Sequence, residues 1–476
     1  MSGAQGRQAY ADGEWHRLHP LTPALRSWRI LVVVLVIGVQ NGADNLLSGD
    51  FNTPPDVNGR LLAGGGAIIL VVLAVGVVYS VLSWRMSRFR VGPEALELYT
   101  GVLFRQHRQA RLDRLQAVDV VQPFLARLTG LARLTLEVAG GSGSAVSLSY
   151  LTDGQAQSLR NHLLARAAGV RYDTDEAPEA PEQVAVSVGA PRLVLSLALS
   201  GPSLALALGT PLLIVVALAI GNVGPLLGIV PTAFGAISLL WQRFAGQFGF
   251  LVATSPDGLR LRHGLLEHRT QTVPPGRVQA VRLSQPLLWR IPDWWQVHAN
   301  VAGYGGSSAE DAPGTESTLL PVGSRAEAIA VLSLVLPDAG VQPGEHPGEV
   351  VDAGLSGSTP TAGYVVVPRR ARWVDPIAWR RTGFRVTSAA LLIRRGRLRR
   401  ALDVVPHART QSVGLRQGPL QRRLRLVSFT LHSTPGPVSP EVPHLDAATA
   451  ARLLAEQVDR ARAARASSGP ERWMER

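Results

Sequence analysis

Three long apolar runs without a single charged residue constrain the fold of this chain more than any other feature. They cover residues 61–84, 193–220 and 223–241, which are 24, 28 and 19 residues long. An α-helix needs about 20 residues to cross the hydrocarbon core of a bilayer, and a buried helix of a soluble protein rarely stays uncharged for so long. The three runs are therefore predicted to be transmembrane helices.

A fourth, weaker run lies over residues 28–47, and its far end is polar because it contains Asn41, Asp44 and Asn45. We expect this run to form a helix that pairs with 61–84 as a hairpin. A signal peptide fits less well, because no small-residue cleavage site clearly follows and the run begins well inside the chain. The runs 193–220 and 223–241 form a second predicted hairpin.

The charges beside these runs predict how they are oriented. All 48 basic residues are arginine and the net charge is +13, a usage typical of a GC-rich bacterial genome. Arginines flank the predicted hairpins on the side away from their short loops, and the first loop is acidic. Because basic flanks stay in the cytoplasm, we expect a multi-pass protein of the bacterial plasma membrane whose N-terminus and larger soluble regions are cytoplasmic.

A sequence pattern, R-x-Q-x-V-x-x-x-Q, occurs three times. Each copy is followed five residues later by an arginine, and a glycine precedes its first arginine by 13 residues: Gly101, Gly264 and Gly396. Equal spacing of this kind indicates internal repeats. The pattern consists of Arg114, Gln116, Val118 and Gln122, then Arg277, Gln279, Val281 and Gln285, then Arg409, Gln411, Val413 and Gln417.

Each repeat is predicted to contain several strands and a final helix. Short apolar or alternating stretches lie on both sides of the pattern, and the glycines suit tight turns with positive φ. Capping residues precede the predicted helices: Thr152 with Gln155, Ser324 with Glu327, and Asp446. Strands followed by a helix are typical of an α+β fold.

The resulting domain plan alternates membrane hairpins and modules. We expect a hairpin at 26–84, a first module at 85–168, a linker at 169–192, a second hairpin at 193–243, a second module at 244–337, a flexible linker at 338–378, a third module at 379–465 and a disordered tail at 466–476.

The repeated pattern, with Gln122 and Gln285 each followed by proline, resembles the bacterial pleckstrin-homology-like domains that are flanked by membrane helices. The resemblance implies a strongly bent seven-stranded antiparallel sheet with a C-terminal helix. It also implies a smaller membrane protein of the same family as a partner. The third copy departs from it, because Gly418 follows Gln417, and the second copy has a Gly/Ser/Asp-rich insertion at 303–315. The fold alone does not supply a ligand.

The repeated Arg and Gln, two residues apart, share one face of a strand and could hold a carboxylate or phosphate. Their recurrence in all three copies favours a structural role. No metal, cofactor or catalytic residue is expected, because cysteine is absent, no histidine has an acidic neighbour at metal-binding spacing, and no nucleotide-binding or nucleophile motif opens a helix.

The third copy carries most of the positive charge, with 16 arginines against two acids between Arg369 and Arg425. A cytoplasmic basic surface near a bilayer attracts anionic lipids; a solvated charged loop is the alternative. Nucleic acid is not expected, since aromatic residues are not interleaved with the arginines. Five arginines surround Gly396 and are candidates for anionic-lipid contact: Arg394, Arg395, Arg397, Arg399 and Arg400.

The functional hypothesis is a non-enzymatic integral membrane scaffold. Its cytoplasmic modules would bind proteins or anionic lipids, with a role in envelope stress, and self-association is left open. The alternative is a component of a membrane transport or export complex. That role predicts charges along a path through the membrane, which the three strongest runs lack.

Overall fold

The structure is a computed structural model. It describes residues 14–23, 25, 71, 74–92, 94–101, 105–138, 146–167, 182–255, 258–273, 276–302, 317–336, 347–358, 360 and 362–467. The predicted span 28–47, the start of 61–84 and the tail from 468 lie outside these residues. The chain divides into two compact units, of which the first holds repeat 1 and the second holds repeats 2 and 3.

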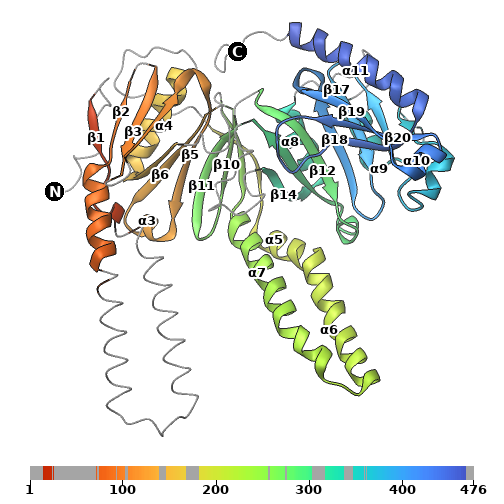
Figure 1. The fold of residues 1–476 in the computed structure, drawn as a ribbon, viewed down its shortest axis with the longest axis horizontal. Coiled ribbons are helices and arrows are strands. Elements are labelled where there is room, and N and C mark those ends of the chain that lie inside the picture. The colour runs from red at the N-terminus through yellow and green to blue at the C-terminus, as the bar shows by residue number, and fades with distance from the viewer. Residues whose placement is uncertain are drawn as a thin grey trace. The chain divides into compact units, whose positions relative to one another are not determined.

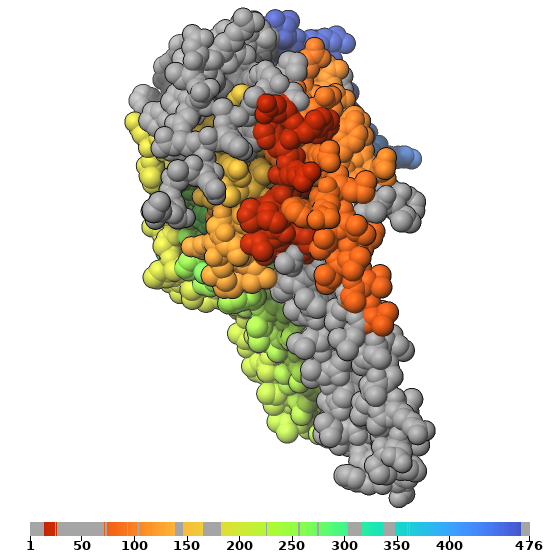
Figure 2. All heavy atoms as spheres, turned by 90° about the vertical axis from the view of Figure 1, so that its left-hand side faces the viewer, coloured from red at the N-terminus to blue at the C-terminus, as the bar shows by residue number. Residues whose placement is uncertain are grey.

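Repeat 1 has seven antiparallel strands and a final helix. Strands β1 to β4 form one sheet, and β5, β6 and β7 pair in sequence order. Figure 2 shows the N-terminal segment (red) lying against the strands that follow it (orange). The elements are β1 (Trp15–Arg17), β2 (Arg88–Val91), β3 (Ala95–Thr100), β4 (Gln106–Arg111), η1 (Leu112–Arg114), β5 (Leu115–Pro123), α3 (Phe124–Leu128), β6 (Leu131–Val138), β7 (Val146–Thr152) and α4 (Asp153–Ala167).

Repeat 2 has the same order, and its membrane hairpin follows its first strand. Repeat 1 is alike, because β1 pairs with β2 on the far side of the apolar helix Ala74–Met86, so the predicted start of the first module at 85 is wrong. Strand β8 pairs with β9 on the far side of the hairpin. The predicted linker 169–192 and module start at 244 are therefore wrong, because residues 183–187 already belong to the module. The elements are β8 (Gln183–Ser187), α5 (Ala190–Ala198), α6 (Gly201–Ile220), η2 (Gly224–Gly228), α7 (Ile229–Gln247), β9 (Leu251–Ser255), β10 (Gly258–His263), β11 (Glu267–Val273), β12 (Val278–Gln285), η3 (Leu288–Arg290), β13 (Trp294–Val301), β14 (Thr318–Ser324) and α8 (Arg325–Val335).

Repeat 3 begins earlier than predicted and has no membrane hairpin. Its first strand, β15, pairs with β16, and helix α9 buries Val350, Val351 and Leu355. The prediction of a flexible linker over 338–378 is thus wrong for the described part from 347 onward. The elements are α9 (Pro347–Ser356), β15 (Val365–Val366), η4 (Arg369–Trp373), β16 (Gly383–Val386), β17 (Ala390–Arg395), β18 (Arg400–Pro406), η5 (His407–Arg409), β19 (Ser412–Arg416), α10 (Pro419–Arg423), β20 (Leu426–His432), β21 (Glu441–Asp446) and α11 (Ala447–Ser467).

Repeats 2 and 3 share one sheet. Strand β12 of repeat 2 pairs with β18 of repeat 3 over five residue pairs, with Arg282 opposite Asp403. The two strands lie side by side in Figure 1 and complete a seven-stranded sheet in the order β14-β13-β12-β18-β17-β16-β15. Each repeat thereby covers a strand edge that the other would leave unpaired.

The local predictions are confirmed. Gly101, Gly264 and Gly396 have φ angles of 103°, 112° and 74°. Ser324 and Glu327 form a complete capping box at the start of α8. In the second hairpin, α6 and residues 226–247 are long and apolar enough to cross a membrane.

Candidate functional site

The turn at Gly264 attaches repeat 2 to the end of membrane helix α7. The backbone N–H groups of Gly264 and Leu265 donate to the carbonyls of Phe248 and Ala245, both at 2.8 Å. Such bonds satisfy carbonyls that the end of a helix leaves without partners. A Cβ on Gly264 would lie 1.9 Å from the Glu267 carbonyl oxygen, so the turn requires glycine.

The other side of the hairpin is attached through α5. Arg192 of α5 forms a 2.7 Å ion pair with Glu327 of α8. The indole Nε1 of Trp289 donates to the carbonyl of Ser196 at 3.1 Å. Both ends of the hairpin are therefore fixed to the soluble body of repeat 2.

An exposed edge lies beside this attachment. Leu287, Ile291 and Leu398 are 49%, 83% and 59% exposed. Arg290 links them, because its guanidinium donates to the carbonyls of Arg397 and Leu398, the latter at 3.3 Å. We call Leu287, Arg290, Ile291 and Leu398 the membrane-proximal edge. Trp289, which lies between Leu287 and Arg290 in the chain, bonds to α5 at the base of the membrane hairpin.

A basic pocket opens where repeats 2 and 3 share their sheet. It has a volume of about 430 Å³. We call it the junction pocket. Its lining residues are Arg282, Ser284, His298, Arg395, Gly396, Arg399, Ala401 and Pro437.

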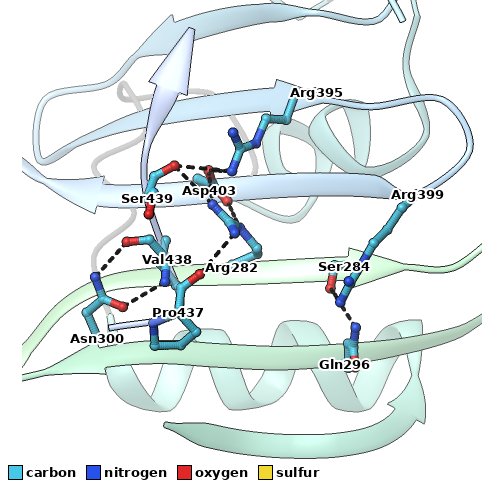
Figure 3. A network of polar contacts seen from close by, with 10 residues as sticks. All are labelled: Arg282, Ser284, Gln296, Asn300, Arg395, Arg399, Asp403, Pro437, Val438 and Ser439. Carbon is cyan, nitrogen blue, oxygen red and sulfur yellow. Dashed lines mark hydrogen bonds and ion pairs between the residues drawn. The ribbon is translucent and has the colours of Figure 1, made fainter. Parts of the chain in front are cut away.

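The floor of the pocket is a closed polar network around Asp403, which is fully buried. Arg282 donates to both carboxylate oxygens of Asp403, at 2.5 and 2.9 Å, and to the carbonyls of Pro437 and Ser439 (Figure 3). Arg395 approaches the same carboxylate at 3.3 Å. This network fixes the loop between β20 and β21 above the shared sheet.

The mouth of the pocket is formed by Arg399, which extends from the Gly396 turn toward Ser284 (Figure 3). Its Nη2 donates to the Ser284 hydroxyl oxygen at 3.4 Å, and that oxygen also accepts a 2.9 Å bond from Gln296. The surrounding protein, and then the nearby Arg282 and Arg243, lower the pKa of Arg399. Arg243, near the end of α7, therefore belongs to the same cluster of positive charges.

His298 adds no charge to this pocket at neutral pH. Desolvation first, and then the neighbouring arginines Arg399, Arg282 and Arg243, lower its pKa to about 4. The pocket is thus lined by three guanidinium groups, on Arg282, Arg395 and Arg399, of which Arg282 and Arg395 pair with the buried carboxylate of Asp403.

The five arginines predicted to contact lipid separate into different environments. Arg394 is fully buried, donates to the carbonyl of Arg381 at 3.0 Å and covers the ring of Tyr364. It therefore has no access to lipid, and the prediction is wrong for this residue. Arg395 and Arg399 line the junction pocket, Arg397 is exposed in the turn, and Arg400 is half-buried at the start of β18.

The repeated glutamines hold strand ends within their own repeats. Gln122 donates to Asp153 at 2.5 Å, Gln285 to Asp293 at 2.8 Å, and Gln417 to the carbonyl of Leu426 at 2.9 Å. None of the pattern residues of repeats 2 and 3 lines the junction pocket. A structural role for the pattern, as favoured by the sequence, agrees with these contacts.

The sequence did not identify Arg282, Ser284, His298 or Asp403 as one group. More than 100 residues separate β12 from β18, and the two strands meet only through sheet pairing. A weak signal existed, because Asp403 is one of only two acids in the basic stretch from Arg369 to Arg425.

Repeat 1 has a pocket beside its own glycine turn. It has a volume of about 400 Å³ and adjoins the end of the apolar helix Ala74–Met86. Its lining residues are Trp15, Arg85, Met86, Arg88, Tyr99, Thr100, Gly101 and Arg105. Among the residues that the structure describes, no three His, Asp or Glu side chains are grouped so that they could hold a metal ion.

His263 makes the attachment to α7 sensitive to acid. Its ring is buried, stacks on Phe250 and has its Nδ1 2.8 Å from the carbonyl of Gly246. Burial lowers its pKa from 6.5 to about 4. Between pH 6.5 and 4 the unfolded chain binds a proton on His263 that the folded chain does not bind. The free energy that neutral His263 contributes to folding is therefore full above pH 6.5 and is lost as the pH falls toward 4.

We expect His263→Gln to remove about 3 kcal/mol of pH-dependent stability over that range, from the size of the pKa shift. The free energy of unfolding of the full chain, measured in detergent from pH 8 to 4, checks this. His432→Gln, at an exposed position, is the control and should keep the wild-type slope. Equal slopes in all three proteins would contradict a buried neutral His263.

Comparison with known proteins agrees with the three repeats. The family model described as "Bacterial PH domain" matches residues 33–167, 194–339 and 331–462. The chain is also 22% identical, over 291 residues, to the UPF0699 transmembrane protein YdbT of Bacillus subtilis (strain 168). That match covers 54% of this chain and 58% of the length of the relative.

Proposed function

The chain belongs to the bacterial PH domain family, and on that basis we propose that it is a non-enzymatic membrane scaffold whose repeats 2 and 3 form one rigid platform on the bilayer surface. The pairing of β12 with β18 is the observation that carries this proposal. Because the sheet is continuous, the hairpin that anchors repeat 2 also fixes the position of repeat 3.

The membrane-proximal edge supports contact of this platform with lipid. It places the exposed side chains of Leu287, Ile291 and Leu398 close to the base of the hairpin. Burial of apolar surface contributes about 25 cal/mol per Å², and each arginine near an anionic surface adds about 1 kcal/mol. Arg290, within the same edge, would contribute the second effect.

A transport role receives less support. Helix α6 has no charged residue, and Arg243 in α7 lies near its cytoplasmic end in the predicted topology. Polar or charged side chains facing the membrane interior mark transport pathways. The hairpin formed by α6 and α7 therefore resembles an anchor more than a pathway.

The natural absence of cysteine permits a direct test with single labels on the full chain. We expect a solvatochromic label on Ile291→Cys or Leu398→Cys, in vesicles of phosphatidylglycerol and phosphatidylcholine, to show a blue-shifted emission and quenching by brominated lipid. Both labels replace apolar side chains at the membrane-proximal edge.

Ser388→Cys supplies the matched control, since it is exposed and lies in the turn at the opposite end of β17 from Leu398. The six residues of β17 separate the two turns by about 20 Å. A label there should be quenched by aqueous iodide and not by brominated lipid. If the labels at 291 and 398 behave like the label at 388, the platform stands clear of the bilayer and the proposal is wrong.

A further inference from the structure

We propose that the junction pocket binds a phosphate group, presented either by a phospholipid headgroup or by a soluble phosphate compound. The inference deepens the proposed scaffold function and rests on it for the lipid source alone.

The positive charge of the junction pocket is only partly balanced by carboxylates. Both oxygens of Asp403 already accept bonds from Arg282, and one of them also faces Arg395. Among the described residues, no carboxylate forms an ion pair with Arg399. An anion that enters the pocket would therefore meet a guanidinium whose charge is not yet balanced.

The hydrogen-bond donors of the pocket are held in place by the surrounding protein. Arg282 and Asn300 hold the rim at Pro437 and Val438 in place, so the pocket is formed before any ligand arrives. The Ser284 oxygen accepts bonds from Arg399 and Gln296, which leaves its own proton available to donate. A guanidinium fork and a hydroxyl suit the oxygens of a tetrahedral phosphate.

The pocket mouth lies near the end of membrane helix α7. Arg243, near the end of α7, is close enough to depress the pKa of Arg399, and Leu398 of the membrane-proximal edge adjoins Arg399 in the chain. If the platform lies on the bilayer as proposed, the pocket mouth is on the lipid side, where a headgroup would supply the phosphate. Soluble phosphate would reach the same donors from the cytoplasm.

The test uses the full chain and two charge-matched variants. Arg399→Gln removes a pocket donor, whereas Arg397→Gln removes an exposed arginine from the same turn that does not line the pocket. In one arm, inorganic phosphate is titrated against the protein in phosphatidylcholine nanodiscs at constant ionic strength, and the unfolding temperature is followed. In the other, native mass spectrometry counts phosphatidylglycerol retained from mixed micelles.

We expect phosphate to raise the unfolding temperature of the wild type and of Arg397→Gln, and Arg399→Gln to weaken binding about tenfold or more, as loss of a charge-assisted bond predicts. Ser284→Ala should weaken it by a smaller factor. Retention of phosphatidylglycerol lost only in Arg399→Gln identifies a lipid source; a phosphate effect without lipid retention identifies a soluble one.

Two outcomes would overturn the inference: no effect of either probe on the wild type, or equal losses in Arg399→Gln and Arg397→Gln, which would reflect net charge alone. The labels at positions 291 and 398 report the platform separately. Phosphate binding by a protein whose labels stay in water would support the pocket and reject the bilayer platform. Lipid-exposed labels in a protein that binds no phosphate would support the platform and reject the pocket.

Discussion

Replacing Asp403 by alanine should lower the free energy of unfolding by about 3–5 kcal/mol, as expected for a buried ion pair that loses one partner. Asp403 is fully buried and accepts two bonds from Arg282, whose side chain is only 18% exposed. Without the carboxylate, Arg282 and Arg395 would face each other across the floor of the junction pocket. The loss should also loosen the loop that contains Pro437 and Ser439.

Denaturant unfolding of the full chain in detergent, followed by tryptophan fluorescence, measures this effect. The control is Glu456→Ala, which removes an acid from the solvent-accessible i,i+4 pair with Arg460 and should cost about 0.5 kcal/mol or less. The double variant Arg282→Met with Asp403→Leu should recover part of the loss, because a buried pair can be replaced by apolar side chains. A loss at Asp403 as small as that at Glu456 would mean that the carboxylate is not buried in this network.

Trp295→Ala should destabilise the protein by about 3–5 kcal/mol, the cost of removing a large side chain from a packed core. Trp295 is fully buried on β13, and its indole Nε1 donates to Asp293 at 3.0 Å. Its loss would leave a cavity in repeat 2 and remove one of the two hydrogen bonds that Asp293 Oδ1 accepts, the other coming from Gln285. Because β13 belongs to the sheet that repeats 2 and 3 share, part of the destabilisation should extend to repeat 3.

The adjacent Trp294 is the matched control, because it has the same composition and lies on the same strand but is only partly buried. Trp294→Ala should cost clearly less than Trp295→Ala in the same denaturant titration. Similar losses at the two positions would contradict the assignment of Trp295 to the core and Trp294 to its margin.

Much of this architecture follows from the sequence because its signals are local. The runs that include α6 and α7 are recognisable from length and absence of charge alone. The turns at Gly264 and Gly396 require positive φ, and the cap formed by Ser324 and Glu327 involves residues three positions apart. Each of these features depends on neighbours along the chain, so the order of residues is sufficient to predict it.

The insertion of the hairpin inside repeat 2 was not predicted, because β8 is short and its partner β9 lies beyond the whole hairpin. Helix α9 was hidden within a Gly- and Pro-rich stretch whose composition suggested a linker. Its buried residues, such as Leu355, become evident only when the surface of repeat 3 against which they pack is known. In both cases a distant partner outweighs the local composition.

The membrane hairpin formed by α6 and α7, the three repeats and their turns and caps could be predicted from local sequence alone. Which arginines can contact a ligand depends on the tertiary structure. Arg394 and Arg395 are neighbours in the chain, yet one is enclosed by carbonyls and the ring of Tyr364 while the other faces the pocket. Successive residues of a strand point to opposite faces, and the pairing of β12 with β18 determines what each face meets. That pairing creates the junction pocket, because it brings Arg282 of repeat 2 to Asp403 of repeat 3.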